Sequence, residues 1–352
     1  MKIGILTWYY GTNYGAKAQA YALQETLSTL GADVYMINYK GKEYQRVNLR
    51  SCLDFKRQKE HPFRIAKGLV KYTRFEAFTH KYYHETKSVA NAFSIDDLGF
   101  DYIVLGSDAI FNIKHAFFND IYYGVGINRT KKITYAPSCE YLSPSVTLTK
   151  DICNSLKKMH GLSVRDTATM ELIENNTELK PIRVLDPTFL CDFNKFELSY
   201  KIETGYILVY SFSEWNEFGN SVKEFAKKHN KKIVAIGRYC DWADISYIDC
   251  SVEDWISFFR GASVVFTDSF HGVAFSLKNR KQIILCSRAD KRAKIIDLLD
   301  TFNIEVGYFN NNESIDAYLQ KNYIDYDQVN SLYQEKINFS LKFLKRTIFE
   351  GI

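Results

Sequence analysis

Short apolar runs separated by polar turns divide the first part of the chain into strands and helices. Residues 3–9 form such a run, which predicts a buried strand, and residues 33–39 and 102–107 predict two more. Between the first two runs, apolar residues recur at helical spacing over residues 16–30, and Gly31 follows as a helix stop. Strand, helix and strand in this order are typical of a parallel sheet with right-handed crossovers.

The alternation continues through the rest of the chain. Further strands are predicted over residues 132–135, 162–165, 183–185, 206–212, 232–237, 264–268 and 282–286. Helices are predicted over residues 145–160, 216–229, 254–260 and 273–278, and a long amphipathic helix over residues 327–349. Two successive sets of strands and helices predict an α/β protein with two Rossmann-like domains.

The length of the chain also fits two domains, because a typical domain has about 100–200 residues. We expect a first domain over residues 1–188, a link over residues 189–204, a second domain over residues 205–326 and a C-terminal helix over residues 327–352. This layout resembles the GT-B architecture, in which a central ligand cleft lies between the carboxyl ends of two sheets. In that architecture a closing helix often crosses back to the first domain.

Composition and cysteine spacing narrow the class of protein. Hydrophobic residues make up 46% and charged residues 25%, which is typical of a globular protein. The net charge of +5 is too small to indicate nucleic-acid binding, and no motif supports it. Seven cysteines show neither a disulfide framework nor a C-x-x-C metal site, which favours reduced thiols in the cytoplasm. No apolar run approaches a membrane span or a signal peptide, so we expect a soluble or at most peripheral protein.

One basic stretch stands out from this background. Residues 40–87 hold 13 Lys or Arg against 5 Asp or Glu, with Tyr and Phe interleaved. One interpretation is a solvated, basic helical insertion. The other is a surface that meets anionic lipid at the inner membrane surface, or a diphosphate-linked acceptor.

Two loops of the first domain carry polar residues directly after apolar strands. Asn13, Tyr14 and Gly15 precede a helix, whose N-terminus is suited to bind an anion. A turn from strand to helix needs glycine in any case, and no dinucleotide or P-loop motif is present. Ser107 and Asp108 follow the strand over residues 102–107, where they can hydrogen-bond sugar hydroxyls or cap a helix.

Two further side chains could carry chemistry. Arg165 ends a strand and can grip a phosphate or carboxylate with two hydrogen bonds, or pair with Asp166 at the surface. His271 lies in the turn between an apolar strand and an apolar helix. A histidine there can exchange a proton near neutral pH, or simply bond to a nearby carbonyl.

Six segments in order resemble the polysaccharide pyruvyltransferase family. They are NYGAxxQAxAL, GSD, YAPS, VRD, LDPT and SFHG at residues 13–23, 106–108, 135–138, 164–166, 185–188 and 269–272. Lys291 and Arg292 before an apolar helix also fit. The chain departs from the family's motifs at Ala109, Phe111, residues 139–140 and Ser269.

The resemblance implies an activity and a set of site residues. The donor would be phosphoenolpyruvate, and the acceptor a sugar or lipid-linked oligosaccharide of a capsular or exopolysaccharide precursor, joined as a pyruvate ketal. It implies no metal and no cofactor beyond this co-substrate. Catalytic roles fall to His271 and Arg165; donor binding to Ser269, Phe270, Gly272 and Arg292; and acceptor binding to Asn13, Tyr14, Gly15, Gln19, Ser107 and Asp108.

Asn13, Asp108, Arg165 and His271 all follow predicted strands, so we expect these four residues to face one cleft. Two other functions remain open. A GT-B nucleotide-sugar glycosyltransferase would share the architecture and the basic residues. A catalytically silent sugar-binding scaffold protein would agree with the departures from the motifs. The oligomeric state is left open.

Overall fold

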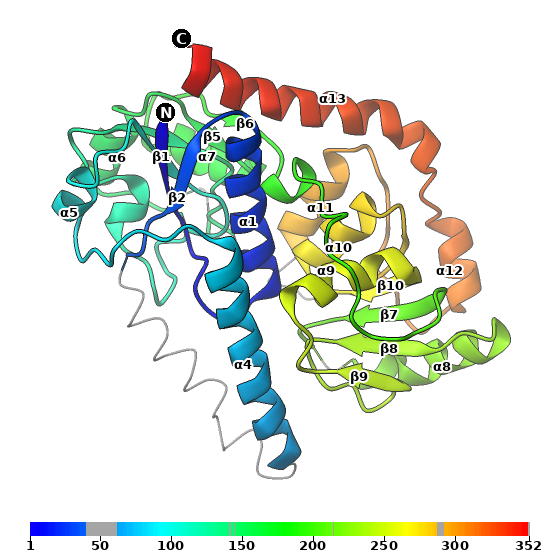
Figure 1. The fold of residues 1–352 in the computed structure, drawn as a ribbon. Coiled ribbons are helices and arrows are strands. Elements are labelled where there is room, and N and C mark those ends of the chain that lie inside the picture. Colours follow the sequence, from blue (N-terminus) through cyan, green and yellow to red (C-terminus); the bar gives the residue numbers. More distant parts are fainter. Residues whose placement is uncertain (40–61, 141, 144, 214, 287–291, 351–352) are drawn as a thin grey trace. The chain divides into compact units, whose positions relative to one another are not determined.

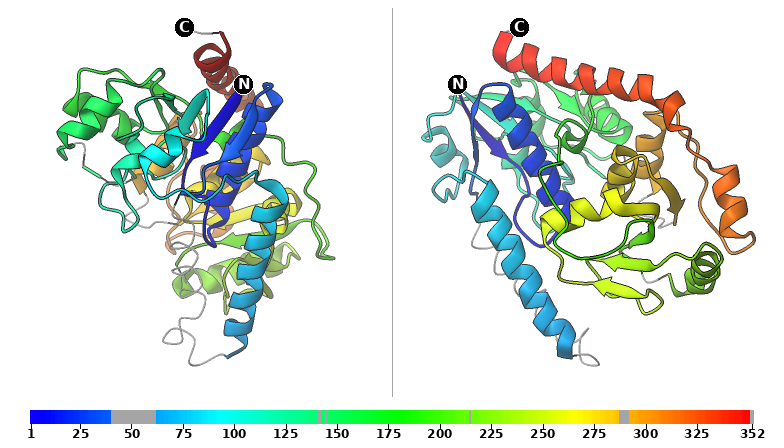
Figure 2. Two further views of the ribbon diagram at one scale, coloured as in Figure 1. Left: turned by 60° about the vertical axis from the view of Figure 1, so that its left-hand side comes forward. Right: turned by 45° about the vertical axis from the view of Figure 1, so that its right-hand side comes forward.

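The structure is a computed structural model that describes residues 1–350 except residues 40–61, 141, 144, 214 and 287–291. Two compact units divide the chain. Unit 1 comprises Met1–Arg46, Thr79–Asp192 and Leu332–Ile352, and unit 2 comprises Val47–Phe78 and Phe193–Ser331. Figure 1 labels the helices and strands, and Figure 2 shows them from two further directions.

Unit 1 is built on a parallel sheet with strand order β2-β1-β3-β4. Its strands are β1 (Lys2–Leu6), β2 (Asp33–Met36), β3 (Tyr102–Leu105) and β4 (Lys131–Thr134). A short parallel pair, β5 (Ser163–Val164) and β6 (Ile182–Arg183), follows β4. Gly161, two residues before β5, forms an isolated parallel bridge with Ile133 of β4. Its helices include α1 (Tyr14–Thr29), α5 (Ala92–Asp96), α6 (Lys150–Leu156) and α7 (Thr167–Asn176).

The strand order of unit 1 reverses between β1 and β3. The chain passes from β1 to β2 on one side and then returns to place β3 on the other side of β1. The side chains of β3 are buried throughout, as expected for a parallel sheet covered on both faces. In open α/β sheets, ligands bind outside the carboxyl ends of the strands where the order reverses. In unit 1, residues 7–13 and 106–108 occupy this position.

Unit 2 has a parallel sheet of its own with strand order β11-β10-β7-β8-β9. The strands are β7 (Tyr206–Tyr210), β8 (Ile233–Ile236), β9 (Ile245–Tyr247), β10 (Ala262–Thr267) and β11 (Gln282–Leu285). The helices include α8 (Gly219–Lys228), α9 (Val252–Gly261), α10 (Phe270–Lys278), α11 (Arg292–Asp300) and α12 (Ile315–Lys321). The order reverses between β7 and β10, where residues 211–213 and 268–272 lie.

Two long helices contribute residues to both units. Helix α4 (Pro62–Tyr82) begins in unit 2, and its last four residues belong to unit 1. Helix α13 (Tyr326–Leu344) also begins in unit 2. Its later part packs within unit 1, where Ser340 Oγ accepts the backbone N–H of Leu185 (3.0 Å). The predicted return of the C-terminal helix to the first domain is therefore confirmed.

The predicted fold class is confirmed, with strands that are mostly shorter than expected. Some details of the predicted secondary structure are wrong or incomplete. The helix expected over residues 145–160 is only Lys150–Leu156, and α7, β9 and α12 were not predicted. The basic insertion was expected in the first domain; of its described residues, 62–78 group with unit 2 and 79–87 with unit 1. Residues 40–61 of the basic insertion lie outside the described part of the chain. Among the residues that the structure describes, no helix is long and apolar enough to span a membrane.

Candidate functional site

The turn before α1 lies at the carboxyl end of β1. Asn13 is exposed and caps α1, because its Oδ1 accepts the backbone N–H of Ala16 (3.2 Å). Tyr14 and Gly15 are buried in the first turn of the helix. Of these three predicted acceptor residues, Asn13 is the one whose side chain is open to a ligand.

A buried hydrogen-bond network joins α1 to the end of β3. Ser107 Oγ donates to Gln19 Oε1 (2.8 Å), and the hydroxyl of Thr7 donates to the carbonyl of Ser107 (2.7 Å). All three side chains are buried. Gln19 and Ser107 therefore bind each other and hold the strand ends in place.

Asp108 follows this network and is more accessible. Its backbone lies in the left-handed region (φ 76°), and its carbonyl accepts the N–H of Ser138 (2.8 Å) from the YAPS segment. Its carboxylate Oδ1 lies 3.9 Å from Arg165 Nη1. A side chain so placed at the edge of the sheet can reach a ligand hydroxyl while it contacts Arg165.

Arg165 lies at the centre of a cluster of carboxylates. Its Nη1 donates to Asp186 Oδ2 at 2.8 Å, and its Nε lies 4.0 Å from Asp166 Oδ2. Only 3% of its side chain is exposed. Burial alone would lower the pKa of Arg165, but Asp186, Asp108 and Asp166 more than offset this, so the pKa is raised and the guanidinium is charged.

The acidic residues around Arg165 also organise the backbone. Asp186 Oδ1 accepts the N–H of Thr188 (3.0 Å) in the LDPT segment. Asp166 Oδ1 accepts the N–H of Thr169 (2.9 Å) and so caps α7. One guanidinium surrounded by three carboxylates is not a cationic anion site. The geometry thus favours a positioning role for Arg165, and its predicted role in donor binding stays a prediction.

In unit 2, Asp268 joins the ends of β10 and β7. Its buried carboxylate accepts the backbone N–H groups of Phe212 (2.8 Å) and Ser213 (3.2 Å) and the indole N–H of Trp215 (3.1 Å). Three donors from one loop satisfy this charge and fix the loop beside β10. The role of Asp268 was not predicted, because its partners come from a segment more than 50 residues earlier.

The turn after Asp268 leads directly into α10. Ser269 caps the helix and accepts the N–H of Gly272 (3.4 Å), while Phe270 and His271 lie in its first turn. A Cβ atom on Gly272 would lie 2.1 Å from the Thr267 hydroxyl oxygen, so glycine is required there. His271 is 8% exposed and lies beside the positive end of a nine-residue helix.

Two arginines of unit 2 lie in segments that follow strands. Arg238 comes two residues after β8, and its guanidinium donates to the carbonyl of Phe212. The backbone N–H of the same Phe212 donates to Asp268. The ends of β8, β7 and β10 are thereby linked in one row. Arg292 begins α11, and its guanidinium lies 4.9 Å from the centre of the Tyr308 ring. Arg238 was missed, because Gly-Arg-Tyr after a strand matches no motif.

A comparison with the models of known protein families shows the family of this chain. The model of the polysaccharide pyruvyl transferase family matches residues 13–290, most of the chain. The chain belongs to the polysaccharide pyruvyl transferase family. The predicted family is confirmed, and all six motifs lie within the matched residues. The comparison with curated protein sequences gave no match.

Solved structures show which fold this family member has. The UDP-GlcNAc 2-epimerase of Neisseria meningitidis, bound to UDP-GlcNAc, has a TM-score of 0.58 at 10% identity, covering 99% of this chain and 100% of that chain. A putative UDP-N-acetylglucosamine 2-epimerase of Listeria monocytogenes has a TM-score of 0.54 at 10% identity, covering 100% and 97%. At this identity the likeness concerns the fold alone, which is GT-B-like.

Except for Ser269 in unit 2, the departures from the family's motifs lie in unit 1. Ala109 is buried, and Phe111 stacks on Tyr123 with ring centres 3.9 Å apart in the core. Glu140 has a positive φ of 56° and accepts a long hydrogen bond from the buried amide of Asn112 (3.4 Å). These residues therefore pack or position the edge of the sheet. Among the described residues no group of three or more His, Cys, Asp or Glu is placed to hold a metal ion.

The expectation that Asn13, Asp108, Arg165 and His271 face one cleft combines residues of both units. Asn13, Asp108 and Arg165 lie at strand ends of unit 1, whereas His271 lies at the edge of unit 2. Within each unit the expected residues do gather where the strand order reverses. The shared cleft itself stays a prediction.

Proposed function

We propose that this polysaccharide pyruvyl transferase uses phosphoenolpyruvate as its donor and joins the pyruvyl group to two hydroxyls of one sugar. The choice of donor rests on the residues at the edge of unit 2. There His271 and the capped start of α10 lie at the reversal of strand order, in a row with Arg238. A helix N-terminus and a guanidinium suit a ligand with a phosphate and a carboxylate.

The reaction balances without a cofactor. Two O–H bonds of the sugar and the C2–O bond to phosphate break, and two C–O bonds form at C2. C3 of the donor gains one of the two protons and becomes a methyl group, while the released phosphate takes the other. The product is a cyclic ketal that carries the donor's carboxylate.

In this scheme His271 moves a proton, either to C3 of the donor or to the departing phosphate. Imidazole is suited to this task near neutral pH, and general acid–base help contributes about 10²–10⁴ to a rate. Ser269, Phe270 and Gly272 shape the turn that carries His271, and their backbone lies at the start of α10. We propose that the donor's phosphate binds here, with Arg238 and Arg292 as the cations that stabilise its charge.

We propose that unit 1 binds the sugar acceptor. Asn13 and Asp108 are the accessible side chains at its sheet edge, and both can hydrogen-bond hydroxyls. Tyr14, Gly15, Gln19 and Ser107 would act behind them by fixing the turn and the strand end. The six cysteines of the described part are free thiols, which fits the cytoplasmic location that we propose.

Thermal stabilisation by ligands tests the donor. We expect phosphoenolpyruvate to raise the melting temperature of the full chain, because a ligand at 100 times its Kd stabilises a fold by about 2.7 kcal/mol. UDP- and GDP-sugars serve as the comparison. Stabilisation by a nucleotide sugar and not by phosphoenolpyruvate would replace this proposal with a glycosyltransferase.

Turnover is the second part of the test. We expect phosphate release from phosphoenolpyruvate that depends on an added sugar or lipid-linked oligosaccharide acceptor. Stabilisation by phosphoenolpyruvate without release, across a panel of such acceptors, would instead favour a catalytically silent binding protein.

A further inference from the structure

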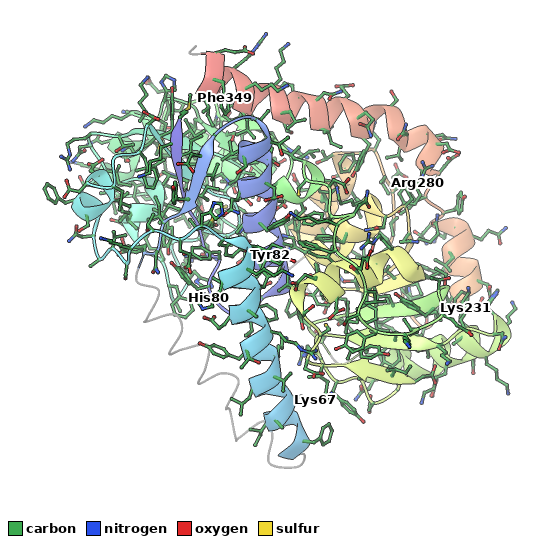
Figure 3. The ribbon with its side chains drawn as sticks, viewed as in Figure 1. Lys67, His80, Tyr82, Lys231, Arg280 and Phe349 are labelled. Carbon is green, nitrogen blue, oxygen red and sulfur yellow. The ribbon has the colours of Figure 1, made fainter. Side chains whose placement is uncertain are left out.

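Phe212 is the accessible side chain where the strand order of unit 2 reverses. Residues 211–213 follow β7 and residues 268–272 follow β10, so both segments lie at the carboxyl ends of their strands. Phe212 is 41% exposed, whereas the other residues of these two segments are buried or half-buried. Lys231, which Figure 3 labels, comes just before β8 and marks the opposite, amino end of the same parallel sheet. A ligand at the carboxyl edge of unit 2 therefore meets an apolar ring.

Neighbouring strands hold the backbone of Phe212 in place. Its N–H donates to Asp268 (2.8 Å), which follows β10, and its carbonyl accepts a hydrogen bond from the guanidinium of Arg238, which follows β8. The ring packs edge-on against the buried Tyr210, with 5.6 Å between the ring centres. Because both polar backbone groups are bonded, the position of Phe212 is fixed while its ring stays accessible.

The pairing of β7 with β10 places Phe212 beside the start of α10. The two parallel strands pair Tyr210 with Thr267, and Phe212 and Ser269 each come two residues later. Ser269 caps α10, and His271 lies in the first turn of that helix. The apolar ring therefore lies next to the residues to which donor binding and proton transfer are assigned above.

The polar setting of this ring argues against chance exposure. Single exposed apolar side chains are common on protein surfaces and need no function. Phe212, however, lies between two serines that hydrogen-bond each other. Ser211 Oγ donates to the carbonyl of Ser213 (2.9 Å) and accepts its N–H (3.1 Å). This turn presents one apolar side chain at the edge where open α/β sheets bind ligands.

The proposed donor offers a matching group. Phosphoenolpyruvate carries a phosphate and a carboxylate, and Arg238 and the start of α10 are their proposed partners. Its third part, the methylene carbon C3, has neither charge nor a hydrogen-bonding atom, so an apolar partner suits it. A hydroxyl at the same place would lose its bonds to water against the ring without gaining a partner.

We infer that Phe212 packs against C3 of the donor and selects for an apolar group at that carbon. The inference rests on the proposed function, because it takes phosphoenolpyruvate as the donor. Many phosphorylated acids share the phosphate and the carboxylate, so cations alone cannot distinguish them. Phe212 adds a contact that depends on the third group of the donor, and specificity is a difference between such affinities.

Two unreactive analogues isolate this contact. Phospholactate and 2-phosphoglycerate of the same configuration at C2 both carry the phosphate and the carboxylate, and they differ only in a methyl or a hydroxymethyl group at C3. Calorimetry with the full chain measures the Kd of each. We expect phospholactate to bind about tenfold more tightly, since an apolar site rejects an added hydroxyl by at most about a hundredfold.

Substitutions at Phe212 then test which residue sets this ratio. Phe212→Ser should bring the ratio of the two Kd values close to one, mainly by weakening phospholactate binding. Phe212→Leu keeps an apolar side chain and should retain most of the ratio. The matched control is Tyr323→Ser, because Tyr323 is a 67% exposed aromatic residue of unit 2 between α12 and α13, and it should leave both Kd values unchanged. Unchanged melting curves show that the variants are folded.

The possible failures are distinguishable. If the unchanged chain binds neither phosphoenolpyruvate nor the analogues, the proposed donor is wrong and the inference falls with it. If all three bind and Phe212→Ser keeps the ratio, the donor stands and the inference alone is wrong. A Phe212→Ser variant that keeps the ratio but raises the KM for the acceptor would assign the ring to the sugar instead.

Discussion

The carboxyl edges of the two sheets are alike in position and opposite in electrostatics. Each lies where its strand order reverses, and each carries motif residues of the family directly after buried strands. In unit 1, one guanidinium, that of Arg165, is surrounded by three carboxylates. In unit 2 the single carboxylate of Asp268 is satisfied by three N–H groups, and Arg238 lies beside it.

This difference indicates that the charged residues around Arg165 stabilise the fold of unit 1, whereas the cations of unit 2 are placed to bind a ligand. Around Arg165 in unit 1, three carboxylates outnumber the one guanidinium, so an incoming anion meets an excess of negative charge there. The edge of unit 2 retains cations and the start of a helix, and it holds the histidine. The donor that we propose, which carries a phosphate and a carboxylate, therefore suits the edge of unit 2, and neutral sugar hydroxyls suit the edge of unit 1.

The largest expected effect is on catalysis at the edge of unit 2. His271→Ala should lower pyruvyl transfer by about 10²–10⁴, because it removes the proposed proton carrier. The measurement is phosphate release from phosphoenolpyruvate with an acceptor, alongside a melting curve. His229→Ala, a histidine on the exposed end of α8, is the control and should keep normal activity. Near-normal turnover of His271→Ala with an unchanged melt would make His271 structural.

The next effect is on stability at the edge of unit 1. Arg165→Ala should lower the free energy of unfolding by about 3–5 kcal/mol, because it leaves buried carboxylates without their partner. Urea unfolding measures this loss. Arg165→Lys should restore only part of it, since an ammonium cannot reproduce the guanidinium fork. A stable Arg165→Ala variant that no longer binds phosphoenolpyruvate would reverse the comparison and support the donor-binding role predicted from the sequence.

A smaller effect should appear in donor affinity. Arg238→Gln should weaken phosphoenolpyruvate binding by roughly ten- to hundredfold, the value of about 1.5–3 kcal/mol for a hydrogen bond to a charged group. The side chain is exposed, so the melting temperature should change little. Calorimetry measures the affinity, and Arg280→Gln, on a solvent-exposed ion pair, is the matched control. Equal affinity of both variants would remove Arg238 from the site.

Much of this architecture could be predicted from the sequence, because buried parallel strands are short apolar runs bounded by turns. The positions of Asp108, Arg165 and His271 at strand ends follow from that pattern alone. Strand order does not, since it depends on which strands pair across long crossovers. Helix α7 escaped prediction because its segment, TATMELIENN, is largely polar and has few apolar positions at helical spacing.

The chemical environment of Arg165 could not be predicted from the sequence either. Its carboxylate partners come from the ends of β3 and β5 and from the segment after β6, and only the folded sheet brings them together. For the same reason Gln19 and Ser107 were predicted as acceptor contacts, although they hydrogen-bond each other in the core. A polar residue at a strand end therefore identifies a region of the fold, and its partners decide its role.

Two serines offer the finest test of the contrast between the edges. Ser107→Ala leaves the buried Gln19 Oε1 without its donor and should cost about 1–3 kcal/mol of stability, with no change in KM for phosphoenolpyruvate. Ser269→Ala removes the cap of α10, which costs about 1 kcal/mol, and should also raise that KM several-fold because the start of the helix frays. Ser276→Ala, on the same helix and bonded to the Gly272 carbonyl, controls for loss of a hydroxyl away from the helix start. Urea unfolding and steady-state phosphate release measure both quantities. If Ser107→Ala raises the KM for phosphoenolpyruvate as much as Ser269→Ala does, the donor contacts both edges, and the division of roles between the units is wrong.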